Sequence, residues 1–104
     1  MRLIRNPDSL DGLFPAGRPT AALFVMSGCP FCRRFIPEFE SYARRREGEI
    51  EAVTVVLDDD ASPLWDRYGI SVVPTVLRLE EGTVTARLDG RPGAGLAAAD
   101  LESL

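Results

Sequence analysis

The two cysteines of the chain, Cys29 and Cys32, are separated by only two residues, Pro30 and Phe31. Thiols at this spacing can form a reversible redox couple, supply half of a metal site, or make a structural disulfide. A disulfide between positions i and i+3 closes a very short loop and gains little chain entropy, which argues against a purely structural role. The rest of the sequence helps to decide between the redox role and the metal-binding role.

A structural zinc site needs four ligands, and the chain offers two thiolates and no histidine. Zinc binding would therefore require carboxylates or a second copy of the chain, and we predict no metal and no other cofactor. The net charge of −4 argues against a nucleic-acid-binding surface. The basic run at residues 44–46 fits the last turn of a helix, where the helix dipole favours cations.

The N-terminal sequence MRLIRNPDSL carries charges and a proline where a signal peptide has an apolar core. No apolar run approaches the roughly 20 residues of a membrane-spanning helix. These features predict a cytoplasmic protein without a membrane partner. In a reducing compartment, a Cys-x-x-Cys pair is catalytic or metal-binding more often than it is a static crosslink. A length of 104 residues suits one domain, so we expect residues 1–104 to form a single unit.

The pattern around the cysteines predicts a buried strand followed by a helix. Residues 20–26 form a continuous apolar run between turn residues, which is typical of a strand buried on both faces. Aromatic residues then recur every three or four positions and predict a helix that ends at Gly48; they are Phe31, Phe35, Phe39 and Tyr42. Pro30 fits the first turn of this helix, whereas Pro37 lies in its interior and should kink it.

The remaining patterns predict two more strands, three short helices and a hairpin with a tight turn at Glu81 and Gly82. The strands are residues 2–5 and 50–57, the helices are residues 6–14, 62–69 and 95–104, and the hairpin is residues 71–90. The resulting order, βαβαβαββα, predicts an α/β fold with a mixed sheet of about five strands and helices on both faces. The first three strands should be parallel, and the hairpin should add two antiparallel strands at one edge.

This arrangement resembles a thioredoxin over nearly the whole chain. The resemblance depends on CPFC between a buried strand and a helix, Pro37 five residues after the second cysteine, YGISVVPT before the hairpin, EEGTV in its turn, and LDG at its end. It implies the thioredoxin fold for a single thioredoxin-like domain. It also implies that Cys29 is the nucleophilic cysteine, that Cys32 is the resolving cysteine, and that the two form a redox-active disulfide.

The resemblance further implies a substrate-binding groove around the cysteines. Pro74 matches the family's cis-proline, and a cis bond there would bring the backbone of Val73 beside the sulfur, where it can pair with an extended peptide. Gly90 matches the glycine that borders this groove. The complete predicted substrate-binding set is Gly28, Pro30, Phe31, Val72, Val73, Pro74 and Gly90.

Several positions depart from the thioredoxin pattern. Gly28 replaces the tryptophan before the first cysteine. The dipeptide Pro30-Phe31 replaces Gly-Pro and is more typical of glutaredoxins, although the glycine-rich glutathione signature of that family is missing. Leu23 stands where thioredoxins keep a buried aspartate below the resolving thiol, and Val55 stands where they keep the lysine partner of that aspartate. Water, or an acid such as Glu38, would then have to accept the proton of the resolving thiol.

The sequence therefore predicts a thiol–disulfide oxidoreductase that reduces or exchanges protein disulfides through a mixed disulfide on Cys29. Backbone N–H groups at a helix start stabilise a thiolate, and Arg33 and Arg34 add positive charge nearby. The expected partners are disulfide-containing proteins and a reductase, either thioredoxin reductase or glutathione, and we expect a monomer. The alternatives are a thioredoxin-like protein-binding module, a glutathione-linked reductase of glutaredoxin type, and a dimeric zinc-binding protein.

Overall fold

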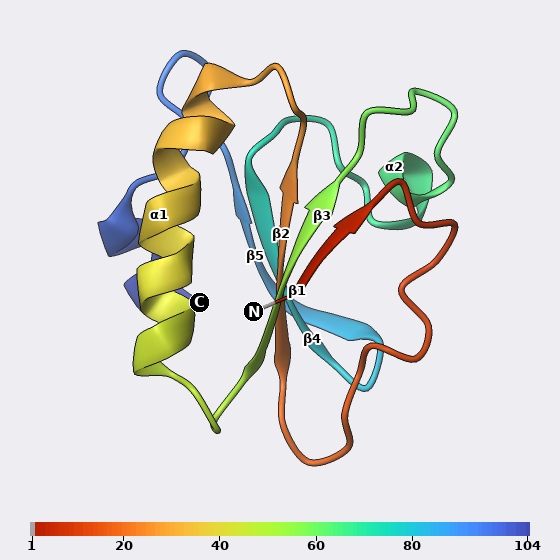
Figure 1. The fold of residues 1–104 in the computed structure, drawn as a ribbon, viewed down its shortest axis with the longest axis vertical. Coiled ribbons are helices and arrows are strands. Elements are labelled where there is room, and N and C mark those ends of the chain that lie inside the picture. Colours follow the sequence, from red (N-terminus) through yellow and green to blue (C-terminus); the bar gives the residue numbers. More distant parts are fainter. Residues whose placement is uncertain (1) are drawn as a thin grey trace.

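A five-stranded sheet forms the centre of the molecule, with the strand order β1-β3-β2-β4-β5 (Figure 1). The computed structural model describes residues 2–104. The strands are β1 (Arg2–Arg5), β2 (Thr20–Val25), β3 (Glu51–Val56), β4 (Thr75–Glu80) and β5 (Thr83–Asp89). The helices are α1 (Pro30–Arg45), α2 (Leu64–Arg67) and the 3₁₀ helix η1 (Ala98–Ser103).

The sheet is mixed. Strands β1 and β2 each pair with β3 in parallel, whereas β4 pairs antiparallel with both β2 and β5. A two-residue turn at Glu81 and Gly82 joins β4 to β5, and both residues have the positive φ angles, 51° and 88°, that suit a tight hairpin. The predicted parallel strands, the hairpin at one edge and the α/β class are confirmed.

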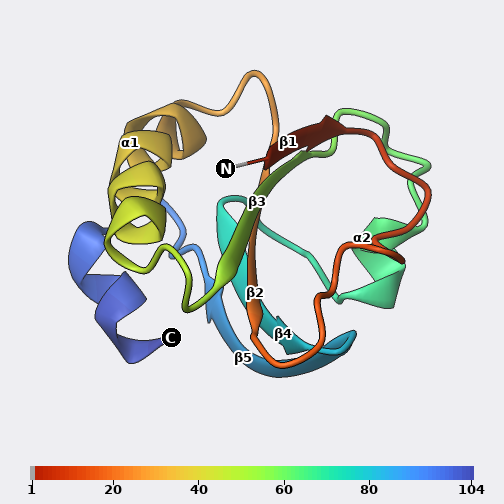
Figure 2. The same cartoon turned by 60° about the horizontal axis from the view of Figure 1, so that its bottom comes forward.

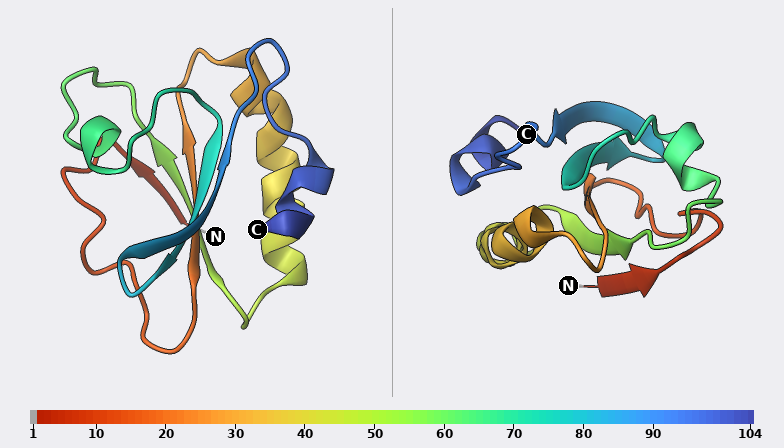
Figure 3. Two further views of the ribbon diagram at one scale, coloured as in Figure 1. Left: turned by 180° about the vertical axis from the view of Figure 1, so that it is seen from behind. Right: turned by 90° about the horizontal axis from the view of Figure 1, so that it is seen from above.

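Helices cover both faces of the sheet, as predicted. Figures 1 and 2 show α1 and η1 on one face and α2 on the other, and the view from above in Figure 3 shows the same layers. Because side chains alternate along a strand, β2 serves both cores. Leu23 and Val25 pack in the cluster with α1, while Ala22 and Phe24 pack in the cluster with α2. All six residues of β2 are buried, as a central strand requires.

The predicted helix at residues 6–14 is wrong, because this segment consists of turns and bends. Asn6 has a φ of 47°, and its Oδ1 accepts hydrogen bonds from the backbone N–H groups of Asp58 and Asp59 at 2.9 and 3.1 Å. The amide side chain therefore binds a distant loop and does not cap a helix. Leu10, only 1% exposed, fills the core on the α2 side, which an irregular segment can reach.

The other predicted helices occur with different lengths. Pro63 is the N-cap residue of the short helix α2, one position later than predicted, and the hydroxyl of Ser62 before it accepts a hydrogen bond from the N–H of Leu64 at 3.2 Å. The C-terminal helix is a 3₁₀ helix, and helix α1 continues through Pro37 to Arg45. Among residues 2–104, no helix is both long and apolar enough to cross a membrane.

Candidate functional site

The two cysteines lie at the start of α1, directly after the loop that follows β2. Cys29 is the N-cap residue, with extended backbone angles, and its Sγ accepts a hydrogen bond from the N–H of Cys32 at 3.1 Å. Cys29 is half-buried, whereas Cys32 is fully buried, and both are free thiols. The first cysteine is therefore partly exposed at a helix N-terminus, and the second lies one turn further along the helix, inside the core.

Cys32 is enclosed by apolar side chains. Its cluster includes Leu23, Val25 and Val56 from the sheet, together with Phe35 from α1. Burial, and then the hydrogen bond with the Cys29 sulfur, raises the pKa of the Cys32 thiol to about 12. Desolvation disfavours the charged thiolate, so Cys32 holds its proton at neutral pH.

Leu23 lies in the same core cluster as Cys32, as predicted, whereas Val55 does not. Leu23 is fully buried in the cluster that contains Cys32, where the resemblance implies an aspartate in other members. The assignment of Val55 as its partner position is wrong, because Val55 packs on the opposite, α2 side of the sheet. Val56 shares the cluster of Leu23 instead, since consecutive strand residues face opposite ways. Glu38 is exposed on α1 and lies outside this cluster.

The Val73–Pro74 peptide bond is cis, in the form that the resemblance implies. The Sγ of Cys29 lies 3.8 Å from the carbonyl oxygen of Val73, 44 residues further along the chain. Gly90, directly after β5, packs closely on this segment: a Cβ atom there would lie 2.6 Å from the carbonyl oxygen of Pro74. The fold thus brings Cys29, Val73, Pro74 and Gly90 together.

The other predicted site residues lie in the loop before α1, at the start of α1 and in the segment before the cis bond. Gly28 and Pro30 are exposed on either side of Cys29, and Val72 is half-buried in the segment before the cis bond. Phe31 is half-buried against Gly95, where a Cβ atom would lie 2.9 Å from the Cβ of Phe31. The contact with Gly95 was not predicted, although the glycine-rich stretch RPGAG at residues 91–95 is a signal for such close packing.

Arg34 contacts this loop rather than the cysteine sulfur. Its guanidinium lies over the Phe31 ring, 5.2 Å from the centroid, and Nη2 donates a hydrogen bond to the carbonyl of Ala94 at 3.1 Å. Arg33 is exposed in the first turn of α1. The structure therefore gives Arg34 a packing role beside the site, which the sequence pattern alone did not indicate.

A carboxylate supports the loop before Cys29. Asp58, just after β3, accepts a hydrogen bond from the N–H of Ser27 at 2.8 Å and another from the Ser27 hydroxyl. These hydrogen bonds, together with the charge of Arg5, hold the pKa of Asp58 below its usual value. The DDD sequence that closes the strand thus also fixes the loop that carries the nucleophile candidate, a role that sequence reasoning missed.

Two further features of the described residues do not add to this site. The part of the chain that the structure describes holds no group of three or more His, Cys, Asp or Glu side chains that could hold a metal ion. A groove of about 720 Å³ lies at the other end of α1, between residues such as Leu3, Ala43 and Ile50, and contains none of the predicted site residues.

Known proteins resemble this chain in both sequence and structure, although no family model matches it. The mitochondrial thioredoxins of Mus musculus and Bos taurus are each 28% identical over 85 residues, which is 82% of this chain and 51% of theirs. The chain thus spans about half the length of the curated relatives it matches.

Solved structures of thioredoxins also resemble this chain. The thioredoxin of Fasciola hepatica has a TM-score of 0.69 at 23% identity and covers 85% of this chain and 78% of its own. The germline-specific thioredoxin Deadhead of Drosophila melanogaster has a TM-score of 0.67 at 19% identity, and the match covers 83% of this chain and 76% of the Deadhead chain. The chain has the thioredoxin fold, and its sequence relatives and structural neighbours support the thioredoxin family.

Proposed function

We propose that residues 1–104 act as one thioredoxin-like domain that reduces or exchanges protein disulfides through Cys29 and Cys32. The observation that carries this proposal is the pairing of a partly exposed cysteine with a buried one in one helical turn. Cys29 is half-buried and its Sγ accepts a hydrogen bond from the N–H of Cys32, while Cys32 is fully buried. Such a pair can exchange one sulfur with a substrate while it protects the other.

The first step forms a mixed disulfide on Cys29. The Cys29 thiolate attacks one sulfur of a substrate disulfide, a new S–S bond forms, and the second substrate sulfur leaves as a thiolate that takes up a proton. The backbone N–H of Cys32, at 3.1 Å, and the start of α1 favour the negative charge on the attacking sulfur. The half-exposed position leaves room for the substrate to approach.

The backbone of Val73 supplies the proposed docking site for the substrate chain. Its carbonyl oxygen is 3.8 Å from the Cys29 sulfur, so a peptide that pairs with this segment would place its own sulfur near Cys29. Main-chain pairing does not depend on the side chains of the substrate, so it would permit a broad range of substrates. The proposed contact set is the one predicted from the sequence: Gly28, Pro30, Phe31, Val72, Val73, Pro74 and Gly90.

The second step releases the substrate. The Cys32 sulfur attacks the Sγ of Cys29, the Cys29–Cys32 disulfide forms, and the remaining substrate sulfur leaves as a thiolate. Cys32 must first lose its proton, and its burial among apolar side chains, which raises the pKa of its thiol, makes this costly near neutral pH. Because Leu23 cannot accept a proton, we propose that the proton passes to water or to the departing thiolate, and that this step accelerates as the pH rises.

An external reductant must then return two electrons and two protons to the disulfide. We propose thioredoxin reductase or glutathione for this role, with the protein acting as a monomer in the cytoplasm. The missing glutathione signature favours the reductase over glutathione. Recycling by NADPH with thioredoxin reductase, compared with recycling by glutathione, distinguishes the two sources, and cell fractionation tests the compartment.

Insulin reduction in the presence of dithiothreitol tests the proposed activity. The wild-type protein should accelerate insulin precipitation, and Cys29→Ser should abolish the acceleration. Failure of the wild-type protein to accelerate the reaction would instead support a thioredoxin-like binding module. Equal activity of wild type and Cys29→Ser would contradict the assignment of the nucleophile.

A further inference from the structure

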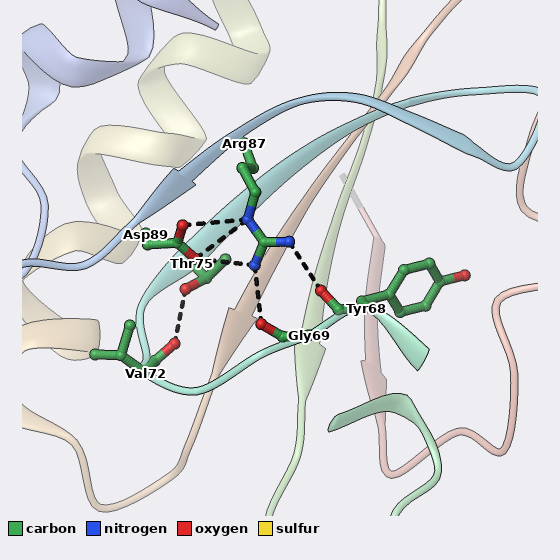
Figure 4. A network of polar contacts seen from close by, with 6 residues as sticks. All are labelled: Tyr68, Gly69, Val72, Thr75, Arg87 and Asp89. Atoms are coloured by element: carbon green, nitrogen blue, oxygen red, sulfur yellow. Dashed lines mark hydrogen bonds and ion pairs between the residues drawn. The ribbon is translucent and has the colours of Figure 1, made fainter. Parts of the chain in front are cut away.

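Arg87 on β5 is joined by hydrogen bonds to a segment almost twenty residues earlier in the chain. Its Nη1 donates to the carbonyl oxygen of Tyr68 at 3.0 Å, and its Nη2 donates to the carbonyl oxygen of Gly69 at 3.1 Å. These carbonyls follow the last turn of α2, where backbone oxygens lack helical partners. Figure 4 shows the guanidinium between these two carbonyls and the side chain of Asp89.

Asp89 orients this guanidinium. Its carboxylate accepts hydrogen bonds from Nε at 3.1 Å and from Nη2 at 2.9 Å. Residues two apart on a strand face the same way, so Arg87 and Asp89 project together on the α2 side of the sheet. The planar guanidinium can bind a carboxylate along one edge and still offer N–H groups to two adjacent carbonyls, which a lysine ammonium cannot do.

The segment held by Arg87 leads directly to the proposed docking backbone. It runs from Tyr68 through residues 70–72 to the cis bond at Val73–Pro74. Its far end is also held, because the hydroxyl of Thr75 donates a hydrogen bond to the carbonyl of Val72 at 2.7 Å (Figure 4). Between these two ends, Ile70 is buried in the core on the α2 side.

The end of β5 contacts the same segment a second time. Asp89 is the register partner of Thr75 across the β4–β5 ladder. The next residue, Gly90, lies so close to Pro74 that a Cβ atom would be 2.6 Å from its carbonyl oxygen. Residues 87–90 therefore hold both the beginning and the end of the segment that carries Val73.

We propose that Arg87, oriented by Asp89, is a positioning residue that holds residues 68–74 so that Val73 presents its backbone to an extended substrate beside Cys29. This inference rests on the proposed thiol–disulfide exchange. Arg87 touches neither cysteine, so it acts through the segment and not on the sulfur. Its loss should slow reactions that need main-chain pairing and spare those that need only an accessible Cys29.

The test compares two disulfides that differ in their need for docking. Reduced wild type, Arg87→Met, Arg87→Lys and the control Arg78→Met are reacted in single turnovers with a disulfide-linked extended peptide and with bis(2-hydroxyethyl) disulfide. Arg78 is a suitable control because it lies on the neighbouring strand β4, and within residues 2–104 its guanidinium is paired only with the nearby Glu80, at 4.0 Å. Circular dichroism establishes that each variant is folded at the assay temperature.

Arg87→Met should slow the peptide reaction by about tenfold, since misplacing a docking element costs rate, and should change the small-disulfide reaction by less than about twofold. Arg87→Lys should lie between Arg87→Met and wild type, and Arg78→Met should match wild type with both substrates. Equal slowing of both reactions, or slowing of neither, would overturn the proposal. If Arg87→Met does not fold, Arg87→Lys carries the same comparison.

Failure of the proposed function gives a different result, because the wild-type protein would then react with neither disulfide. The positioning role is still measurable in that case by amide hydrogen exchange. The amides of residues 69–73 should exchange faster in the folded Arg87 variant than in Arg78→Met. Unchanged exchange in this segment would overturn the positioning role independently of any activity.

Discussion

The two faces of the sheet are covered in different ways. On one face lies α1, a helix of 16 residues whose buried positions Cys32, Phe35, Phe39 and Tyr42 follow the helical period. On the other face lies α2, which has four residues, with irregular segments that are held by side chains such as Asn6 and Arg87 binding distant backbone groups. The first face has a long apolar helix packed on it, with long-range polar contacts such as that of Arg34 with the carbonyl of Ala94 at its margin. The second face has little regular helix, so its irregular segments depend more on polar contacts between parts of the chain far apart in sequence.

The largest expected effect is on the α1 side, at Leu23. Leu23→Asp places a carboxyl group in an apolar cluster and removes buried apolar surface. The free energy of unfolding should fall by about 3 kcal/mol or more, as measured by urea denaturation. The same carboxylate should accept the Cys32 proton, so decay of the mixed disulfide at pH 7 should become faster.

Leu23→Asn is the matched control for this prediction. It loses the same packing and introduces a polar group of the same size, but it cannot accept a proton at neutral pH. It should therefore be destabilised to a similar extent without faster decay of the mixed disulfide. Equal acceleration by both substitutions would contradict a role for the missing carboxylate, and full stability of Leu23→Asp would contradict the apolar character of this core.

A smaller effect is expected on the α2 side, at Asn6. Asn6→Gly removes the oxygen that accepts the N–H groups of Asp58 and Asp59 but tolerates the positive φ of 47°. Loss of these hydrogen bonds should lower the free energy of unfolding by about 1 to 2 kcal/mol. Urea denaturation followed by circular dichroism measures the change.

Asn6→Ala separates the two roles of this residue. Alanine lacks the oxygen and is also strained at positive φ, so it should be less stable than Asn6→Gly. If Asn6→Gly were as stable as wild type, the long-range hydrogen bonds would have no part in holding the α2 side. The α2 side would then not depend more than the α1 side on long-range polar contacts.

The smallest expected effect is the pH dependence of the loop before Cys29. Hydrogen bonds from Ser27 lower the pKa of Asp58 in the folded state, so the unfolded chain binds a proton at a higher pH than the folded protein does. The contribution of Asp58 is therefore complete above its unfolded pKa of about 3.9 and is lost as the pH falls through the lower folded value.

Urea midpoints of wild type and Asp58→Asn, measured from pH 7 to pH 2.5, test this dependence. Wild type should be slightly more stable at neutral pH, and the difference should narrow once the pH falls below about 4. Asp60→Asn, at another exposed aspartate of the same loop, is the control and should show no such narrowing. A constant difference at all pH values would contradict the hydrogen-bonded carboxylate.

The sequence predicted the α1 side of the molecule better than the α2 side, for physical reasons. Strand β2 and the start of α1 at Pro30 follow from the apolar period and local turn chemistry, which a short window of sequence contains. The role of Asn6 does not, because its hydrogen-bond partners lie 52 and 53 residues away and are chosen by the fold.

The same reason explains the misses at the site. The hydrogen bond from Arg87 to Gly69 joins residues 18 positions apart in sequence. The contact between Gly95 and Phe31 forms only because the hairpin of β4 and β5 brings the two segments together. Val55 was wrongly assigned as the partner position of Leu23, because the pairing of β2 with β3 places the two side chains on opposite faces of the sheet. The resemblance to thioredoxins, rather than any local pattern, is what pointed to Val73 and Pro74 as neighbours of Cys29.

The most direct test of the central claim is the trapping of a mixed disulfide. A peptide disulfide is added to reduced Cys32→Ser and to reduced Cys29→Ser, and each product is located by mass spectrometry of proteolytic fragments. Cys32→Ser should carry the peptide on Cys29, and Cys29→Ser should remain unmodified because the Cys32 thiol is fully buried with a raised pKa. A peptide adduct on Cys32, or none on Cys29, would contradict the account.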